Sequence, residues 1–124
     1  MIAQLRFDSL PEAARSARRA LSEYLGRHGV LCGPDGVKSA SSQDALLAVS
    51  ELVTHVCRST TGPYHLGMLI EQGRLHLEVA GRNGGAGSTA PHGGLGFGPA
   101  GGLVGEWYVA TNSDGKAIRV TLPI

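Results

Sequence analysis

The chain has 124 residues, of which 42% are hydrophobic and 17% charged, and its formal net charge is +1 at pH 7. This length and composition predict one globular domain, residues 1–124, with a single core, and they exclude a disordered chain. The near-neutral charge gives no support for direct binding to nucleic acid or to a membrane surface.

The two cysteines and the N-terminus bear on the cellular compartment. Cys32 and Cys57 lie far apart and have neither metal-ligand nor redox spacing. The opening residues MIAQLRF are too short and too polar for the apolar segment of a signal peptide, and no run approaches the length of a membrane span. We therefore expect a cytoplasmic protein with reduced thiols.

The N-terminal part of the chain predicts one strand and two helices. Residues 2–7 alternate in hydrophobicity as a short strand does, and SLPE then has the S-x-x-E form of a helix start. This first helix is expected to run to about Arg27. After a loop over residues 31–40, a second helix is expected over residues 41–58, with Ser41 and Asp44 as a capping-box-like start.

The rest of the chain predicts four strands. Residues 64–70 and 75–79 alternate around a hairpin turn that contains Gly73, and two further strands are expected over residues 107–110 and 117–122. Helices that precede a run of antiparallel strands indicate an α+β fold. We expect a two-layer sandwich in which a mostly antiparallel sheet is covered on one face by helices.

Between the second and third of these strands lies a glycine-rich tract. Eleven of the 19 glycines fall between Gly81 and Gly105. Such tracts are typical of loops, although glycine-rich turns also expose backbone N–H groups that can cradle a phosphate. The turn Gly94-Leu95-Gly96-Phe97 has this form.

The second predicted helix has two faces with different character. An apolar stripe at helical spacing should face the core, and a polar row at the same spacing lies on another face. The stripe consists of Leu46, Val49, Val53 and Val56, and the row consists of Asp44, Glu51, His55 and Arg58. A row with an acid, an imidazole and a guanidinium is a candidate site wall, and a solvated polar face is the alternative.

Residues 50–58, SELVTHVCR, resemble the N-box helix of small anti-sigma-factor kinases. These kinases belong to the superfamily of gyrase, heat-shock chaperone and histidine-kinase ATPase domains, abbreviated GHKL. RLHLEV at residues 74–79 is similar to the family's second hairpin strand, and Trp107 and the turn Asp114-Gly115-Lys116 are similar to its last segment. The resemblance covers nearly the whole chain and implies the GHKL ATPase fold, with ATP and Mg²⁺ as cofactors.

The resemblance also implies roles for residues of the second helix. His55 stands where the N-box asparagine helps to hold Mg²⁺, and Glu51, one turn earlier, stands where the family has its catalytic base. Arg58 lies on the same face and joins the implied nucleotide site. Glu51 and His55 could instead hold zinc, but such sites need three or four ligands and the sequence identifies no third.

Other parts of the implied nucleotide site lie beyond this helix. Gly81 stands where an aspartate binds the adenine amino group, and Asn83 could replace that aspartate only with a shifted loop. Gly94, Gly96 and Phe97 match the turn that wraps the phosphates.

Two of the three expected side-chain contacts to Mg-ATP are therefore replaced. Mg²⁺ prefers oxygen ligands to an imidazole, and glycine has no side-chain acceptor. The loss of two charge-assisted contacts would weaken nucleotide binding by about a hundredfold or more. The sequence predicts a regulatory protein of the anti-sigma-factor type that acts through protein–protein binding, with weak or lost ATP binding.

The resemblance implies a sigma factor or an anti-sigma-factor antagonist as the partner, and a homodimer is expected because such family members are often dimeric. Two alternatives remain open. One is an active Mg-ATP-dependent serine kinase that phosphorylates the antagonist, with Glu51 as base. The other is a domain that binds a small ligand on a remodelled nucleotide site.

Overall fold

The computed structural model describes residues 3–7, 12–82, 106–111 and 115–124. Seven elements follow one another along the chain in the predicted order of strand, two helices and four strands. They are β1 (Ala3–Phe7), α1 (Glu12–Arg27), α2 (Ala40–Ser59), β2 (Thr61–Glu71), β3 (Arg74–Arg82), β4 (Glu106–Thr111) and β5 (Gly115–Pro123).

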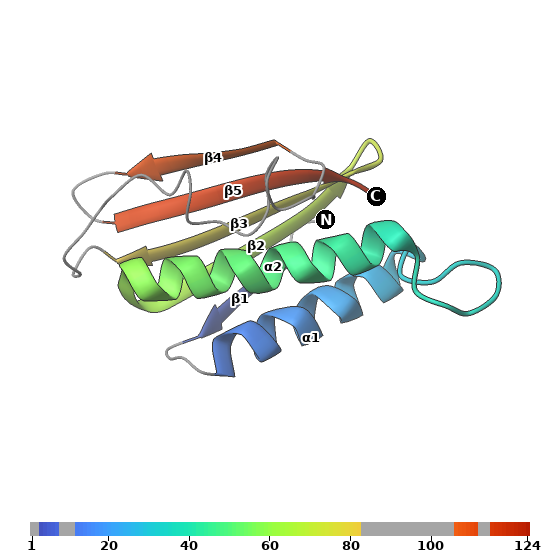
Figure 1. The fold of residues 1–124 in the computed structure, drawn as a ribbon, viewed down its shortest axis with the longest axis horizontal. Coiled ribbons are helices and arrows are strands. Elements are labelled where there is room, and N and C mark those ends of the chain that lie inside the picture. Colours follow the sequence, from blue (N-terminus) through green and yellow to red (C-terminus); the bar gives the residue numbers. More distant parts are fainter. Residues whose placement is uncertain (1–2, 8–11, 83–105, 112–114) are drawn as a thin grey trace.

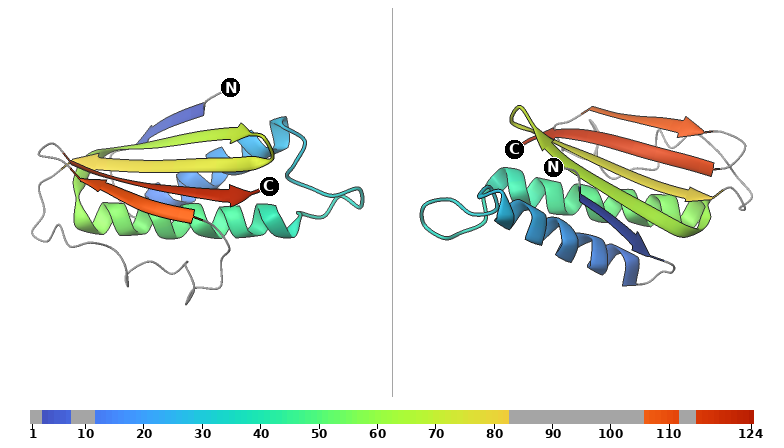
Figure 2. Two further views of the ribbon diagram at one scale, coloured as in Figure 1. Left: turned by 90° about the horizontal axis from the view of Figure 1, so that it is seen from above. Right: turned by 180° about the vertical axis from the view of Figure 1, so that it is seen from behind.

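The strands form one antiparallel sheet in the order β1-β2-β3-β5-β4. Both helices pack on the same face of this sheet, and α2 lies alongside its central strands (Figures 1 and 2). The predicted α+β class and two-layer arrangement are confirmed. The opposite face of the sheet carries no helix among the described residues.

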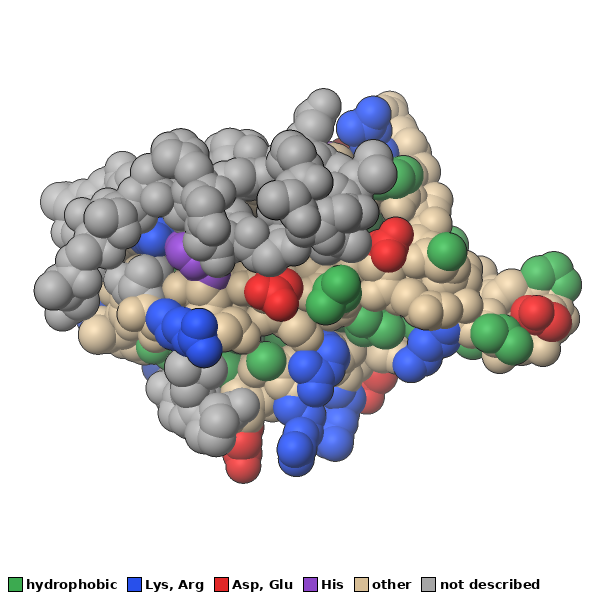
Figure 3. Space-filling model, viewed as in Figure 1, with side chains coloured by type: hydrophobic (Ala, Val, Ile, Leu, Met, Phe, Trp, Pro, Cys, Tyr) green, Lys and Arg blue, Asp and Glu red, His purple; other side chains and the backbone are tan. Residues whose placement is uncertain are grey.

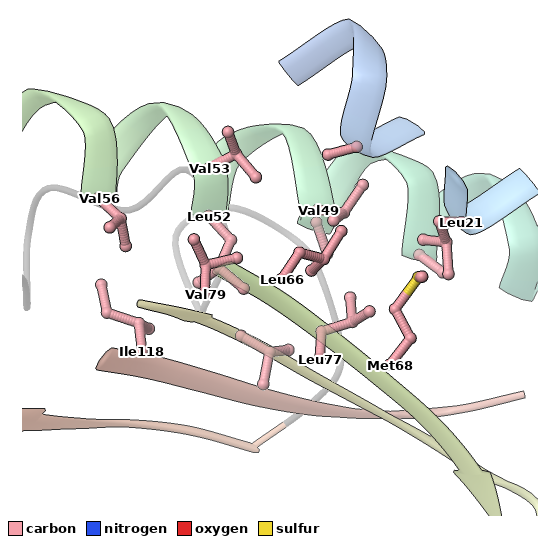
Figure 4. Close-up of a cluster of buried hydrophobic side chains, with 14 of the residues drawn as sticks. Leu21, Val49, Leu52, Val53, Val56, Leu66, Met68, Leu77, Val79 and Ile118 are labelled. Atoms are coloured by element: carbon pink, nitrogen blue, oxygen red, sulfur yellow. The ribbon is translucent and has the colours of Figure 1, made fainter. Parts of the chain in front are cut away.

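The core lies between the sheet and the two helices (Figure 4). Leu75, Leu77 and Val79 of β3 are fully buried, whereas His76 and Glu78 between them are partly exposed, as the alternating pattern predicts. The buried stripe of α2 is wider than predicted, because this helix packs against both α1 and the sheet. It comprises Ala45, Ala48, Val49, Leu52, Val53, Val56 and Cys57. Leu46, expected in the stripe, is only partly buried at its edge.

The start of α2 differs from the prediction. The N-cap is Ser39, whose hydroxyl oxygen accepts a hydrogen bond from the backbone N–H of Ser42 at 3.2 Å. The buried Ser42 hydroxyl in turn donates to the carbonyl of Val30 at 2.8 Å. The expected cap at Ser41 with Asp44 is therefore wrong, and the first turn of α2 contains no acid.

The hairpin between β2 and β3 has the predicted turn. Gln72 and Gly73 have φ values of 52° and 71°, and the flanking Glu71 and Arg74 pair with each other. Positive φ at both central residues matches the twist of the adjoining strands. Both strands are longer than predicted, since β2 begins at Thr61 and β3 continues to Arg82.

The open face of the sheet carries the polar side chains of the same strands. The register places His65 and His76 on this one face, at separate points along β2 and β3. Glu78 and Arg119 form an ion pair across β3 and β5, with 2.7 Å between Oε2 and Nη2. Beside them lies a hollow of about 420 Å³ above Gly67, which has no side chain to fill it.

Candidate functional site

The predicted polar row lies on α2 with its members at different depths. Glu51 and His55 are partly buried, and Arg58, in the last turn, is exposed. This end of α2 lies at the same end of the molecule as the start of β5 (Figure 1). In Figure 3 a histidine surface lies directly beside the surface of a basic side chain. The charges of Lys116 and Arg58 both act on His55, so this part of the row lies close to basic groups.

Lys116 is the main addition to the predicted site. The sequence places it in the turn before the last strand, whereas in the structure it lies in β5 and pairs with Gly81. It shares the inward parity of Ile118 and Val120, so it is only 3% exposed. Its Nζ lies 3.4 Å from Nε2 of His55. The sequence does carry a signal for this position. The inward alternation of Ile118, Val120 and Leu122, extended two residues towards the N-terminus, reaches Lys116.

The environment of this pair opposes positive charge. Burial, followed by the charges of Lys116 and then Arg58, lowers the pKa of His55. Burial also lowers the pKa of Lys116. A neutral His55 can accept a hydrogen bond from the Lys116 ammonium through Nε2, provided that the ring proton is on Nδ1. The pair is therefore a buried ammonium held against an imidazole of depressed basicity.

Gly81 is buried because its neighbours fill the space that a side chain would need. A Cβ at this position would collide with the hydroxyl of Thr60 and would lie 3.1 Å from Cδ1 of Tyr64. The Thr60 hydroxyl is fixed by a 2.5 Å hydrogen bond that it donates to the carbonyl of Val56. The position implied for the adenine-binding aspartate is thus closed by Thr60 and Tyr64, and it offers no acceptor side chain.

A buried thiol lies next to this closed position. Burial raises the pKa of Cys57 to about 11, and a hydrogen bond with Tyr64 partly opposes the rise. The Tyr64 hydroxyl also donates to the carbonyl of Thr60 at 3.3 Å. A thiol with so high a pKa is almost entirely protonated near neutral pH and is a poor nucleophile.

The donors around His55 do not fit Mg²⁺. This ion prefers oxygen ligands, whereas His55 offers nitrogen, and the nearby Lys116 ammonium would repel a divalent cation. Of the two carboxylates in the polar row, only that of Glu51 lies within one helical turn of His55. Within the described ranges, no group of three or more histidine, cysteine, aspartate or glutamate side chains could hold a metal ion.

The remaining predicted site residues lie outside the described residues. These are Asn83, Gly94, Gly96 and Phe97. The site that the structure brings together consists of Glu51, His55 and Arg58 on α2 and Lys116 on β5, next to the closed position at Gly81.

Comparison of the sequence with protein-family models and with curated proteins finds no significant match. None of the helices in the described parts of the chain is long and apolar enough to cross a membrane. The fold and the site therefore carry the functional argument.

Proposed function

We propose that the chain is a regulatory protein of the anti-sigma-factor kinase type, built on the GHKL ATPase fold, in which protein–protein binding has replaced Mg-ATP-dependent catalysis. The order of elements and the N-box-like sequence on α2 support the kinship. The partner is a sigma factor or an anti-sigma-factor antagonist. The protein acts in the cytoplasm, and a homodimer is the expected assembly.

The observation that carries this proposal is the contact between Lys116 and His55. In the family, this region of the helix faces a magnesium ion on the nucleotide phosphates. Here an ammonium lies 3.4 Å from the residue that replaces the metal-binding asparagine. Gly81 adds a second loss, because Thr60 and Tyr64 fill the place of an adenine acceptor. Both changes act against tight binding of Mg-ATP.

Calorimetric titration of the full chain with Mg-ATP tests the nucleotide part of the proposal. We expect no saturable binding at nucleotide concentrations on the order of 100 µM. Saturation at low micromolar concentration would show that the site retains its ancestral ligand, and the proposal of a lost cofactor would then be wrong.

Binding to candidate partners tests the regulatory part. The tagged chain should retain a sigma factor or an antagonist protein through size-exclusion chromatography without added nucleotide. Failure to form a complex with any sigma factor or antagonist of the same cell would contradict the proposal.

A second candidate is the active serine kinase, and one observation favours it. Glu51 lies one turn before His55 and is partly exposed, as a catalytic base must be. Labelled phosphate would then pass from ATP to the antagonist, and Glu51→Gln would abolish the transfer. Absence of transfer from the unmodified chain would leave protein binding as the function.

A further inference from the structure

The open face of the sheet contains a hollow of about 420 Å³ whose floor is Gly67 in β2. Leu69 is the next residue of β2 on this face, and Glu78 of β3 lies opposite Gly67 in the register. A Cβ at Gly67 would meet no atom within 4 Å, so no neighbouring side chain fills the space above it. The hollow therefore has room for a group from outside the chain.

Arg119 holds the carboxylate of Glu78 in place at the side of the hollow. Its Nε and Nη2 both donate to the same oxygen, Oε2 of Glu78, at 3.1 and 2.7 Å. The other oxygen, Oε1, receives no hydrogen bond from the described residues, so it can accept one from a ligand. The ion pair also offsets the positive charge of Arg119, which therefore opposes a bound cation only weakly.

Glu71 adds a second carboxylate to the lining, at the hairpin end of β2. Within the described ranges its side chain has no ion pair or hydrogen bond, and its register partner Arg74 does not line the hollow. His76 lies between the two acids and is oriented by a 3.2 Å contact between its Nδ1 and the hydroxyl of Thr121. The charged lining groups are thus two carboxylates against one guanidinium.

This lining favours a cation with several donors and an apolar stem. A guanidinium is a planar fork of N–H donors that matches carboxylate oxygens, and the methylene stem of an arginine can pack on an apolar side chain such as Leu69. The hollow is also open to solvent, since Gln4, Glu71 and Arg119 in its lining are exposed. Sites for small molecules bury most of the ligand, so an open hollow is better suited to a side chain that a protein holds in place.

We propose that the hollow above Gly67 binds an arginine side chain of a partner protein. Oε1 of Glu78 and the carboxylate of Glu71 accept hydrogen bonds from the guanidinium, and Leu69 packs against the methylene stem. The inference concerns the open face of the sheet and does not rest on the proposed function, whose site lies between α2 and β5.

The test is an NMR titration of the full chain, at constant ionic strength, with a short peptide that contains one arginine between two glycines and has both ends blocked. Binding is followed through the backbone N–H signals of Gly67 and Glu78. We expect saturable shifts with a Kd on the order of 1 mM, as a few charge-assisted hydrogen bonds at an open site would give. The same peptide with citrulline in place of arginine keeps the shape but lacks the charge, and it should bind about tenfold more weakly.

Three variants connect binding to the hollow. Gly67→Val fills the hollow, suits a strand, and should weaken binding by about tenfold or more. Glu78→Gln keeps the shape of the side chain but removes its charge, and it should weaken binding severalfold. Glu23→Gln is the matched control, because Glu23 is also an exposed acid paired with an arginine, but it lies on α1; it should leave binding unchanged.

Four results would overturn the inference. They are the absence of saturable shifts, equal binding of the citrulline peptide, binding unaffected by Gly67→Val and Glu78→Gln, and equal weakening by Glu23→Gln. A parallel titration with agmatine, which carries the same guanidinium without a peptide backbone, tests the source of the cation. Tighter binding of agmatine than of the arginine peptide would assign the hollow to a free small cation instead of a protein side chain.

Discussion

At Gly81, the absence of a side chain allows Thr60 and Tyr64 to fill the space next to the candidate site. Thr60 and Tyr64 occupy the space above it, and no L-side chain fits there without displacing them. This closure depends on packing between the end of α2, the start of β2 and the end of β3. It could not be predicted from the sequence, where Gly81 is the first of eleven glycines between residues 81 and 105.

Gly81→Ala should therefore destabilise the chain by about 1–3 kcal/mol through overpacking. Gly67→Ala is the matched control, because Gly67 lies in the neighbouring strand β2 and an added Cβ there meets no atom within 4 Å. Urea unfolding followed by circular dichroism measures both. Equal stabilities of the two variants would contradict the packing described at Gly81.

His55 should give the fold a measurable pH dependence. Burial, Lys116 and Arg58 lower its pKa in the folded state below the ordinary 6.5, so as the pH falls the unfolded chain takes up this proton first. Its full contribution to stability is present above pH 6.5 and is lost as the pH falls from there towards the folded-state pKa.

The free energy of unfolding should thus fall between about pH 7.5 and about pH 5.5, and His55→Gln should reduce that fall. Urea unfolding at both pH values for both proteins makes the comparison. The other histidines are common to the two proteins, so the difference isolates His55. An equal or larger fall in the variant would mean that His55 titrates normally in the folded chain.

At the scale of the elements, the start of α2 depends on one serine. Ser39→Ala removes the acceptor for the N–H of Ser42 and should cost about 1 kcal/mol of stability. Ser41→Ala changes a serine inside the first turn that caps nothing and should leave stability unchanged or slightly higher, because alanine favours the helix. Thermal unfolding of the two variants compares them, and a larger loss for Ser41→Ala would place the cap at Ser41.

The elements themselves could be predicted because hydrophobic periodicity is local. The alternation of residues 75–79 and the helical stripe of α2 both appear in the structure with the predicted inward faces. The cap could not be placed, because three serines in the region satisfy the same local pattern. Ser39 and Ser42 are selected by their hydrogen bonds to each other and to Val30, twelve residues before Ser42.

The same contrast applies to the candidate site. Glu51, His55 and Arg58 share a helix face because of their spacing, and this was predictable. Lys116 joins them only through the register of β5 against β3, which brings a residue 61 positions away next to His55. Long-range pairing of this kind follows from the fold as a whole rather than from a motif.

At the scale of the whole molecule, the reaction rates of the two cysteines measure how readily α2 separates from the sheet. Cys32 is exposed in the loop before α2, whereas Cys57 is buried between α2 and the sheet and has a pKa of about 11. We expect one rapid and one slow reaction with Ellman's reagent, and a Cys32→Ser variant should retain only the slow one. Two equally rapid reactions would mean that α2 separates readily from the sheet.

The position of β5 in the sheet has a consequence for how the chain can be divided. β5 lies between β3 and β4, pairs with β3 over nine residues, and adds Ile118, Val120 and Leu122 to the core. β4 and β5 are therefore held in the sheet by their own strand pairing, and β5 also by its packing in the core, whatever joins them to residue 82. A protease cut within residues 83–105 should leave a nicked protein that elutes as one species at neutral pH and separates only in denaturant. Early release of the C-terminal fragment would contradict this, while its retention would make residues 83–105 a natural place to divide the molecule into complementing halves.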